Sequence, residues 1–462
     1  MSTSKTENRR STFLEKISWG AGGLTEGLTQ SVFALAFPIF SIGLGVSPFL
    51  IGIANGAIRF IDAITDPVMG NITDNARTRW GRRRPFIFAG AILLSLLYPL
   101  IWMPSRNWSE GGLFAWFFVL TGLFFVAYTI WGIPWSALGL ELSDDYNDRT
   151  RIQIARMVFS TLSGLGVSWI YKICFFFDPD EIIGVRKAGW VIAGILLVGS
   201  IVSAFFVKEW RSIQKQPPIA LKSALKVTLS NKPFLLLCAS ILFYSAGFIM
   251  TDPLLLYVNI YHVYDGARDT ASTIMGVSGT VGVILALVML PVGGWASEKF
   301  GKRRTALIAL TCIIVGRGSL YWLVTPASPY LQLISRAIYQ PGNILMWALI
   351  PAMIADICDL DELKTGRRRE ASFGSVYHWV WKCGATLAAM LSGVLLSLVG
   401  ATAGEPNAML SAEVILRMRL ILGIVPVLLG CIAFLCIWRF PVTQAQIEDA
   451  KRELEIRKQE SL

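Results

Sequence analysis

The sequence has few charged residues, and this scarcity limits the kinds of protein that it can encode. Only 16% of its 462 residues are Asp, Glu, Lys or Arg, whereas a soluble domain carries about 25%. Hydrophobic residues make up 54%, which excludes intrinsic disorder and argues against a large soluble domain. A helix that spans a bilayer needs about 20 apolar residues, so about twelve spans with their loops would use nearly the whole chain.

Groups that would support catalysis or metal chemistry are also scarce. There are only two histidines, His262 and His378, and none of the seven cysteines form a Cys-x-x-Cys pair. This argues against a disulfide framework or a zinc site. The sequence contains no Walker P-loop, His-Glu-x-x-His or Gly-x-Ser-x-Gly motif. We therefore expect neither an enzyme nor a protein with an organic cofactor.

What the sequence does have is a series of twelve long apolar runs. They cover residues 19–45, 48–70, 85–103, 111–140, 152–176, 188–207, 234–258, 270–293, 305–324, 329–355, 371–400 and 413–440. Several exceed 25 residues, which permits tilted helices. We therefore predict an all-α membrane protein with twelve transmembrane helices.

The basic residues are distributed unevenly between the connections. If the N-terminus is cytoplasmic, 30 of the 42 Lys and Arg residues fall in cytoplasmic segments. The outer side then holds only Arg106, Arg186, Lys187, Arg268, Arg417 and Arg419. The positive-inside rule therefore places both termini in the cytoplasm, and we expect a multi-pass protein of the cell (inner) membrane. The net charge of +11 then belongs to the inner face of the membrane, so a nucleic-acid partner is not expected.

The two halves of the chain have weakly similar sequences. Residues 66–74 (Asp-Pro-Val-Met-Gly-Asn-Ile-Thr-Asp) match residues 290–298 (Leu-Pro-Val-Gly-Gly-Trp-Ala-Ser-Glu) without a gap. Each stretch is followed by a glycine and a basic cluster, at 81–84 and at 301–304. This repeat indicates duplication of a six-helix unit, which is the plan of the major facilitator transporters.

The duplication predicts the domain organisation. We expect an N-terminal six-helix bundle at 1–207 that holds a cation site, a cytoplasmic linker at 208–232, a C-terminal six-helix bundle at 233–440 and a cytoplasmic helical tail at 441–462. The acids and basic residues of the repeated loops are predicted to latch one conformation as a cytoplasmic gate: Asp74, Arg82, Glu298 and Arg303. Alternatively, the basic residues only orient the protein in the membrane.

The second run carries three charges on one helical face. Arg59, Asp62 and Asp66 follow one another at spacings of three and four residues, so they cannot all face lipid. Two carboxylates one turn apart suit a cation, because they offer hard oxygen ligands to sodium or a site for a transported proton. The alternative is a structural ion pair between Arg59 and one of the acids.

Aromatic and polar side chains also share helical faces in both halves. Such a mixture suits a carbohydrate-like solute, because sugar rings stack on aromatic rings and bond through their hydroxyls. The candidate substrate-binding residues are Glu26, Arg59, Tyr128, Trp131, Trp135, Arg156, Asn343, Trp347, Tyr377, His378, Trp381 and Lys382. Any single tryptophan here is also explained by packing or by anchoring at the membrane interface, and His378 by either a proton relay or a plain polar contact.

Two motifs resemble those of a known family, the glycoside–pentoside–hexuronide:cation symporters. The first is Asp62-x-x-x-Asp66-Pro67-x-Met69-Gly70 followed by Arg77-x-Arg79-Trp80-Gly81-Arg82-x-Arg84-Pro85; the second is Ile354-Ala355-Asp356-x-x-Asp359 followed by Lys364-Thr365-Gly366-Arg367-Arg368-Arg369-Glu370. The resemblance covers nearly the whole chain and implies the major facilitator fold.

The resemblance assigns roles to several of these residues. It implies that Asp62 and Asp66 are cation-binding carboxylates, that Thr129 joins them, and that Thr65 stands where the family can carry an asparagine. It also implies that Arg156 and Lys382 take part in sugar binding and coupling, and that Trp347 belongs to the sugar site.

The chain departs from the family pattern at the sugar site. Gly27 and Gly132 stand where aspartates of the family hold sugar hydroxyls, and Glu26 lies one residue from the first of them. Loss of two acids with retention of Arg59, Arg156 and Lys382 makes the predicted cavity more cationic. An anionic sugar is therefore one candidate substrate, and a neutral glycoside is another.

The sequence thus predicts a symporter that imports a sugar or glycoside with sodium or a proton, by alternating access. Its partners would be the sugar and membrane lipid, and it would function as a monomer. The alternative is a cation-coupled lysolipid transporter of the same superfamily.

Overall fold

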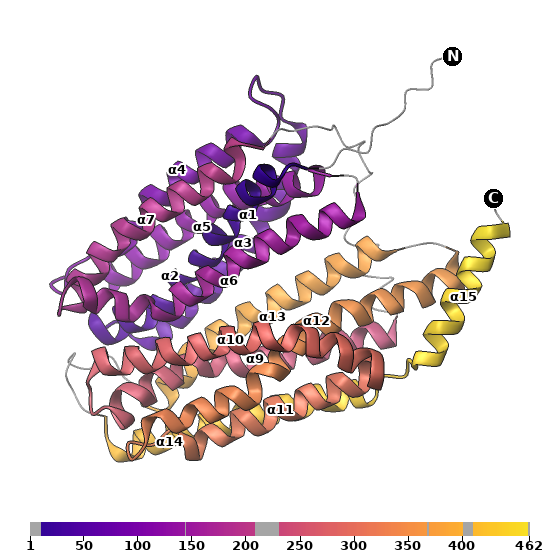
Figure 1. Cartoon of the computed structure of the whole chain (residues 1–462). Helices are drawn as coiled ribbons and strands as arrows, with labels where there is room; N and C mark the ends of the chain where they lie inside the picture. Colours follow the sequence, from indigo (N-terminus) through magenta and orange to yellow (C-terminus); the bar gives the residue numbers. More distant parts are fainter. Residues whose placement is uncertain (1–10, 144, 208–230, 367–368, 401–409, 461–462) are drawn as a thin grey trace. The chain divides into compact units, whose positions relative to one another are not determined.

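The computed structural model describes residues 11–143, 145–207, 231–366, 369–400 and 410–460 (Figure 1). Among these residues there are helices and turns but no strand. By their contacts the described helices divide into two units. The first holds α1 to α7; the second holds α9 to α15, apart from the stretch Met275–Gly279 of α10, which groups with the first.

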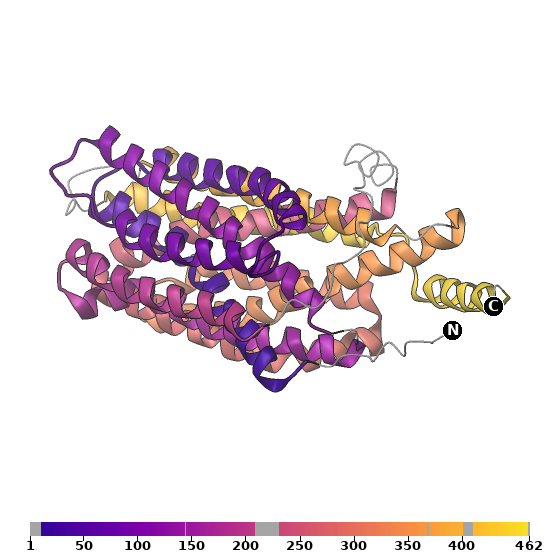
Figure 2. The same cartoon turned by 90° about the horizontal axis from the view of Figure 1, so that it is seen from above.

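The first unit is a bundle whose long helices run alongside one another (Figures 1 and 2). Its elements are α1 (Phe13–Leu28), α2 (Ser31–Leu35), the π-helix η1 (Ala36–Gly43), α3 (Pro48–Asn75), α4 (Arg84–Ile101), α5 (Glu110–Glu141), α6 (Tyr146–Phe177) and α7 (Glu181–Phe205).

The second unit is also a helical bundle. Its elements are α9 (Lys232–Val258), the π-helix η2 (Asn259–Val263), α10 (Arg268–Phe300), α11 (Lys302–Leu323), the 3-10 helix η3 (Pro329–Leu331), α12 (Gln332–Thr365), α13 (Glu370–Leu398), α14 (Ala412–Trp438) and α15 (Gln444–Glu460). The predicted tail helix is therefore present as α15, whereas most of the predicted linker, 208–230, lies outside the described residues.

The predicted all-α membrane fold is confirmed. Eleven of the described helices are long and apolar enough to cross a membrane. The remaining predicted run, 19–45, which is the first in the sequence, is helical but divided among α1, α2 and η1. Pro38 lies within η1, and because proline has no N–H it cannot continue regular helical hydrogen bonding. The sequence therefore located this run but could not show where it is interrupted.

Side-chain caps and glycines set the ends of several helices. The hydroxyl of Thr12 accepts a hydrogen bond from the Glu15 amide, and the Glu15 carboxylate accepts one from the Thr12 amide, which is a capping box. Gly301 separates α10 from α11 with a φ of 80°, a conformation that favours glycine. The second basic cluster therefore begins directly after Gly301, in the first turn of α11.

Helices α1 and α6 approach each other closely along a series of glycines. A Cβ atom on Gly23 would lie 2.5 Å from the Arg156 carbonyl oxygen, and one on Gly27 would lie 1.7 Å from the Ser163 hydroxyl. Small residues allow membrane helices to pack at short range. This contact positions Glu26 on α1 beside Arg156 on α6.

Candidate functional site

Helices α3 and α5 bring together the four residues that were predicted to bind a cation. The Thr129 hydroxyl lies 3.3 Å from Asp62 Oδ1 and 3.2 Å from Asp66 Oδ1. The Thr65 hydroxyl lies 3.1 Å from that of Thr129. Thr129 is buried, whereas both carboxylates are half-buried.

The potential ligands in this cluster are oxygen atoms. Two carboxylates and two hydroxyls are hard ligands that suit a small cation. The described residues contain no group of three or more His, Cys, Asp or Glu side chains arranged for a metal ion. The donor set is therefore compatible with a sodium ion or a proton rather than with a resident transition metal.

Arg59 lies one turn before Asp62 on α3 but does not pair with it. Its guanidinium carbon lies 4.1 Å from the centre of the Phe33 ring, and its Nε is buried without a hydrogen-bond partner. Arg59 forms no ion pair within the described part of the chain. The guanidinium is therefore held by a cation–π contact, and the Asp62 carboxylate acts on its charge without a direct ion pair.

A second charged group lies between α1 and α6. Arg156 Nε donates to Glu26 Oε2 at 3.0 Å, and its Nη2 to Glu26 Oε1 at 2.5 Å. The guanidinium carbon lies 5.2 Å from the centre of the Trp135 ring. Glu26, which lies one residue from the position of the family's missing aspartate, is thus held in a bidentate pair, and the Gly27 position itself faces α6.

The aromatic residues of α5 form a column with Trp19 of α1. Ring centres are 5.2 Å apart for Trp19 and Trp135, 4.8 Å for Trp135 and Trp131, and 6.0 Å for Trp131 and Tyr128. The Trp19 and Trp135 indoles each donate to the other's backbone carbonyl. Trp131 and Trp135 are fully buried, so their observed contacts are those of packing, and Tyr128 is the half-exposed member.

The candidate substrate residues of the second unit lie on α12 and α13. Asn343 accepts a hydrogen bond from the Tyr244 hydroxyl of α9, and the Trp347 and Trp381 rings meet edge to face at 5.5 Å. The Tyr377 hydroxyl and Trp381 Nε1 are buried without a hydrogen-bond partner in the described structure. Buried polar atoms without partners are rare, and a bound solute would satisfy them.

His378 and Lys382 lie on successive turns of α13. His378 is exposed, and its Nδ1 lies 2.9 Å from the Gly374 carbonyl oxygen of its own helix. Its ring also meets the Tyr377 ring edge to face at 5.2 Å. Lys382 is half-buried.

The basic clusters predicted as gates form ion pairs within their own units. Glu141, at the end of α5, lies 2.7 Å from Arg82 and 3.0 Å from Arg83, while Asp74 contacts Arg83 at 3.4 Å. In the second unit Lys302 pairs with Asp356 at 2.6 Å.

Two of the predicted gate residues, Arg303 and Glu298, do not take part in these ion pairs. Arg303 donates to the Trp438 carbonyl, and Glu298 is exposed and forms no ion pair among the described residues. The buried acids Glu141 and Asp356, rather than Asp74 and Glu298, are thus the main partners of the clusters.

Sequence reasoning missed a further ion pair, in which the arginine is buried and the aspartate is exposed. Arg317 of α11 donates to Asp252 of α9 at 2.8 Å, and its guanidinium carbon lies 4.3 Å from the centre of the Tyr339 ring. Both charges lie inside predicted apolar runs, so the rule that selected Asp62 and Asp66 could also have found them.

Comparison with known proteins gives a family match over most of the chain. A family model described as MFS/sugar transport protein matches residues 18–444. A crystal structure of a nucleoside transporter matches with a TM-score of 0.66 and 12% identity, covering 92% of this chain and 99% of that one. This likeness concerns the fold alone.

Named relatives are similar over nearly their full length. A putative glycoside/cation symporter of Escherichia coli is 25% identical, over 96% of this chain and 95% of the relative. A glucuronide carrier protein homolog of the same organism is 25% identical, over 87% and 86%. A sodium-dependent lysophosphatidylcholine symporter of Xenopus tropicalis is 22% identical, over 96% and 89%. The resemblance that the two motifs indicated is confirmed.

Proposed function

Since this chain belongs to the MFS/sugar transport protein family, we propose that it carries a sugar or a glycoside across the cell membrane together with a cation. It is a multi-pass membrane transporter and not an enzyme. In our proposal two six-helix halves, 1–207 and 233–440, joined by 208–232, alternate access to the solute. The protein works as a monomer with both termini and the tail 441–462 in the cytoplasm, and nucleic acid is not a partner.

The observation that carries the proposal is the Thr129 hydroxyl placed between two carboxylates inside membrane-spanning helices. Charges within a membrane are expensive and are usually functional. Asp62, Asp66, Thr129 and Thr65 would hold sodium, or the carboxylates would carry a proton. Symport by the named relatives supports a coupling ion, and no other cofactor is part of the proposal.

The substrate would bind to residues from both units. On the first unit these are Glu26 with Arg156, Arg59, Tyr128 and the buried Trp131 and Trp135; on the second they are Asn343, Trp347, Tyr377, His378, Trp381 and Lys382. Arg59, whose guanidinium lies against the Phe33 ring, favours an anionic group on the sugar. The relative named as a glucuronide carrier homolog supports an acidic sugar, and the relative named as a glycoside symporter leaves a neutral one open.

The basic loops would form the cytoplasmic gate of this cycle. We propose that Asp74, Arg82, Glu298 and Arg303 contribute to it, with Glu141 and Asp356 as the acids that the clusters engage.

Thermal unfolding of the purified protein with a panel of ligands tests the substrate and the ion together. The panel contains neutral glycosides, pentosides, uronides, sulfonated sugars and one lysolipid, each with and without sodium at two pH values. A ligand that binds only the folded state raises the melting temperature. We expect one sugar to do so, and more strongly with the coupling ion.

Asp62→Asn and Asp66→Asn test the cation site itself. Loss of a charged ligand costs about 1.5–3 kcal/mol, so cation-stimulated uptake should fall at least about tenfold while the protein still folds. Full coupled uptake by both variants would contradict the cation site.

A lysolipid is the second candidate substrate, because a relative is named as a lysophosphatidylcholine symporter. Stabilisation by the lysolipid alone, with no response to any sugar, would replace the sugar proposal.

A further inference from the structure

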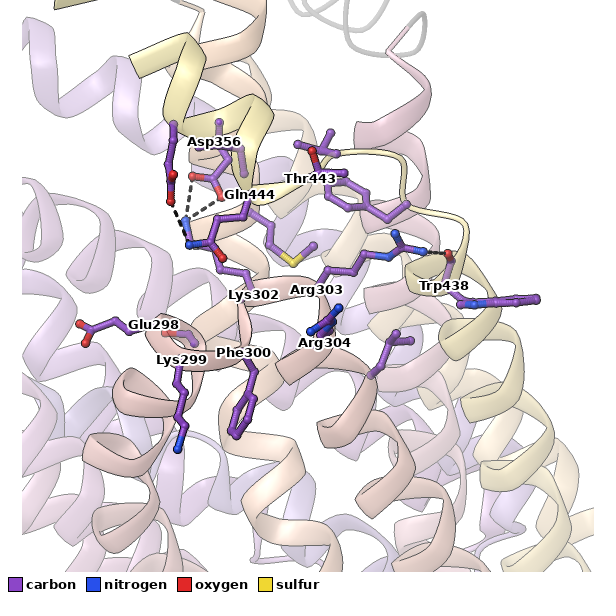
Figure 3. Close-up of a pocket in the computed structure, with 18 residues that line it drawn as sticks. Glu298, Lys299, Phe300, Lys302, Arg303, Arg304, Asp356, Trp438, Thr443 and Gln444 are labelled. Carbon is purple, nitrogen blue, oxygen red and sulfur yellow. Dashed lines mark hydrogen bonds and ion pairs between the residues drawn. The ribbon is translucent and has the colours of Figure 1, made fainter. Parts of the chain in front are cut away.

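A cavity of about 760 Å³ lies in the second unit, where α10 turns into α11. Its walls come from the end of α10, the start of α11, α12, and the connection from α14 to α15 (Figure 3). It is lined by three residues of the proposed gate, Glu298, Arg303 and Asp356, and by none of the proposed cation or substrate residues. The cavity is therefore distinct from the cation and substrate sites.

Basic side chains outnumber acidic ones in the lining by four to three. Lys299, Lys302, Arg303 and Arg304 line the cavity, together with Glu298, Asp356 and Glu448. Lys302 is paired with Asp356 at 2.6 Å. Arg303 and Arg304 form no ion pair within the described part of the chain, and Arg303 Nε is buried without a hydrogen-bond partner. In Figure 3 Glu298 lies on the far side of the turn from Arg303.

The corresponding cluster of the first unit shows what is unusual here. There Arg82 and Arg83 both contact the buried carboxylate of Glu141. Asp356 occupies the comparable place in the second unit, but it pairs with Lys302 and not with Arg303, which reaches only the Trp438 carbonyl. The two copies of the motif therefore differ. Arg83 of the first copy contacts a carboxylate, whereas Arg303 of the second copy lines a cavity.

Aromatic side chains surround this basic cavity. Trp438 and Phe300, which line it, are 57% and 41% exposed, and the neighbouring Trp295 is 56% exposed. Lys299 lies 4.9 Å from the centre of the Trp295 ring. Trp438 is the last residue of a membrane-spanning helix, and exposed tryptophans at such ends lie at the level of the lipid headgroups.

We propose that this cavity binds the phosphate of an anionic phospholipid headgroup, with Arg303 and Arg304 as the anion ligands. The exposed aromatic side chains would contact the upper part of the acyl chains. Basic pockets at membrane-spanning helices are suited to anionic headgroups. A soluble phosphate compound would use the same arginines, but it would gain nothing from the apolar rim.

The test uses the full-length protein purified in detergent and follows thermal unfolding as phosphatidylglycerol is added. Phosphatidylcholine and inorganic phosphate are added in parallel. We expect phosphatidylglycerol alone to raise the melting temperature at low concentration. Because each basic residue contributes a factor of about five to such binding, Arg304→Gln should need about fivefold more phosphatidylglycerol for half of the rise, and Arg303→Gln/Arg304→Gln still more.

The matched control is Arg84→Gln, which changes the counterpart of Arg304 in the first unit and should leave the phosphatidylglycerol response unaltered. Melting in phosphatidylcholine reports whether each variant folds, and Arg304, whose side chain is exposed, provides the milder change. An equal response of the wild type and Arg304→Gln would overturn the site. An equal rise with inorganic phosphate alone, lost in Arg304→Gln, would overturn the lipid as the occupant.

Discussion

At the scale of single residues, Thr129 is the group that joins the two carboxylates of α3. Its hydroxyl lies within 3.3 Å of Asp62 Oδ1, Asp66 Oδ1 and the Thr65 hydroxyl. A hydroxyl in this position can donate to a carboxylate when the site is empty and offer its oxygen to a cation when it is filled.

Thr129→Val therefore tests the cation site without changing its charge. Valine keeps the shape of threonine, but it cannot donate a hydrogen bond to the carboxylates or offer an oxygen atom to a cation. We expect the cation concentration that gives half-maximal stimulation of sugar uptake to rise about tenfold, since hydrogen bonds to charged groups contribute about 1.5–3 kcal/mol.

Thr121→Val is the matched control for this substitution. Thr121 lies two turns earlier on α5, is buried, and has a hydroxyl without a hydrogen-bond partner among the described residues. Its variant should keep the wild-type response to the cation. An unchanged response of Thr129→Val as well would remove Thr129 from the site.

The sequence predicted the parts of this site that depend on one helix. Asp62 and Asp66 could be paired because spacing along a helix fixes which residues share a face. Thr129 entered only through the family resemblance, because periodicity cannot tell which face of α5 meets α3. The burial of Trp131 and Trp135 was not predictable for the same reason. Tryptophans at helical spacing give the same sequence pattern whether they pack against other helices or bind a substrate.

At the scale of helices, close packing of α1 against α6 holds the Glu26–Arg156 pair in place. The glycines of α1 leave no room for a side chain: a Cβ atom on Gly20 would lie 2.9 Å from Ala155 Cβ, and one on Gly23 would lie 2.5 Å from the backbone oxygen of Arg156. A backbone atom cannot move aside as a flexible side chain can.

Gly23→Ala should therefore force α1 and α6 apart and lower the melting temperature. Overpacking of this kind costs about 1–3 kcal/mol, and the shift would also displace Arg156 from Glu26. Gly164→Ala on α6 is the control, because a Cβ atom there meets nothing within 4 Å. Since alanine favours a helix over glycine, this control should melt no lower than the wild type. Equal melting of both variants would contradict close packing at Gly23.

Eleven of the twelve predicted spanning segments correspond to helices that are long and apolar enough to cross a membrane, whereas the irregularities within the segments were not predictable. Length and hydropathy located the helices because each must bury about 20 apolar residues in the bilayer. The break between α1 and α2 and the π-helix η1 depend on how Pro38 and the neighbouring backbone are accommodated, and this is decided by packing. Composition alone contains no such information.

At the scale of the whole molecule, duplication extends from the sequence to the ion pairs. In each unit a basic residue of the repeated loop pairs with a buried acid on another helix: Arg82 with Glu141, and Lys302 with Asp356. The sequence repeat predicted the loops and their acids Asp74 and Glu298, but it could not identify Glu141 and Asp356, which are near the clusters only in space. The two copies then diverged at Arg303, where the proposed lipid site lies.

The orientation of the chain decides which leaflet could supply that lipid. The tail helix α15 lines the cavity, so the cavity and the C-terminus share one face of the membrane. We propose, from the positive-inside rule, that this face is cytoplasmic, where anionic lipids attract basic residues. A fluorescent protein fused after Leu462 should therefore fluoresce, and alkaline phosphatase fused there should be inactive. The same phosphatase inserted at Asn107, between α4 and α5, should be active. The reverse pattern would place both the cavity and the basic loops outside, and would exclude the cytoplasmic gate.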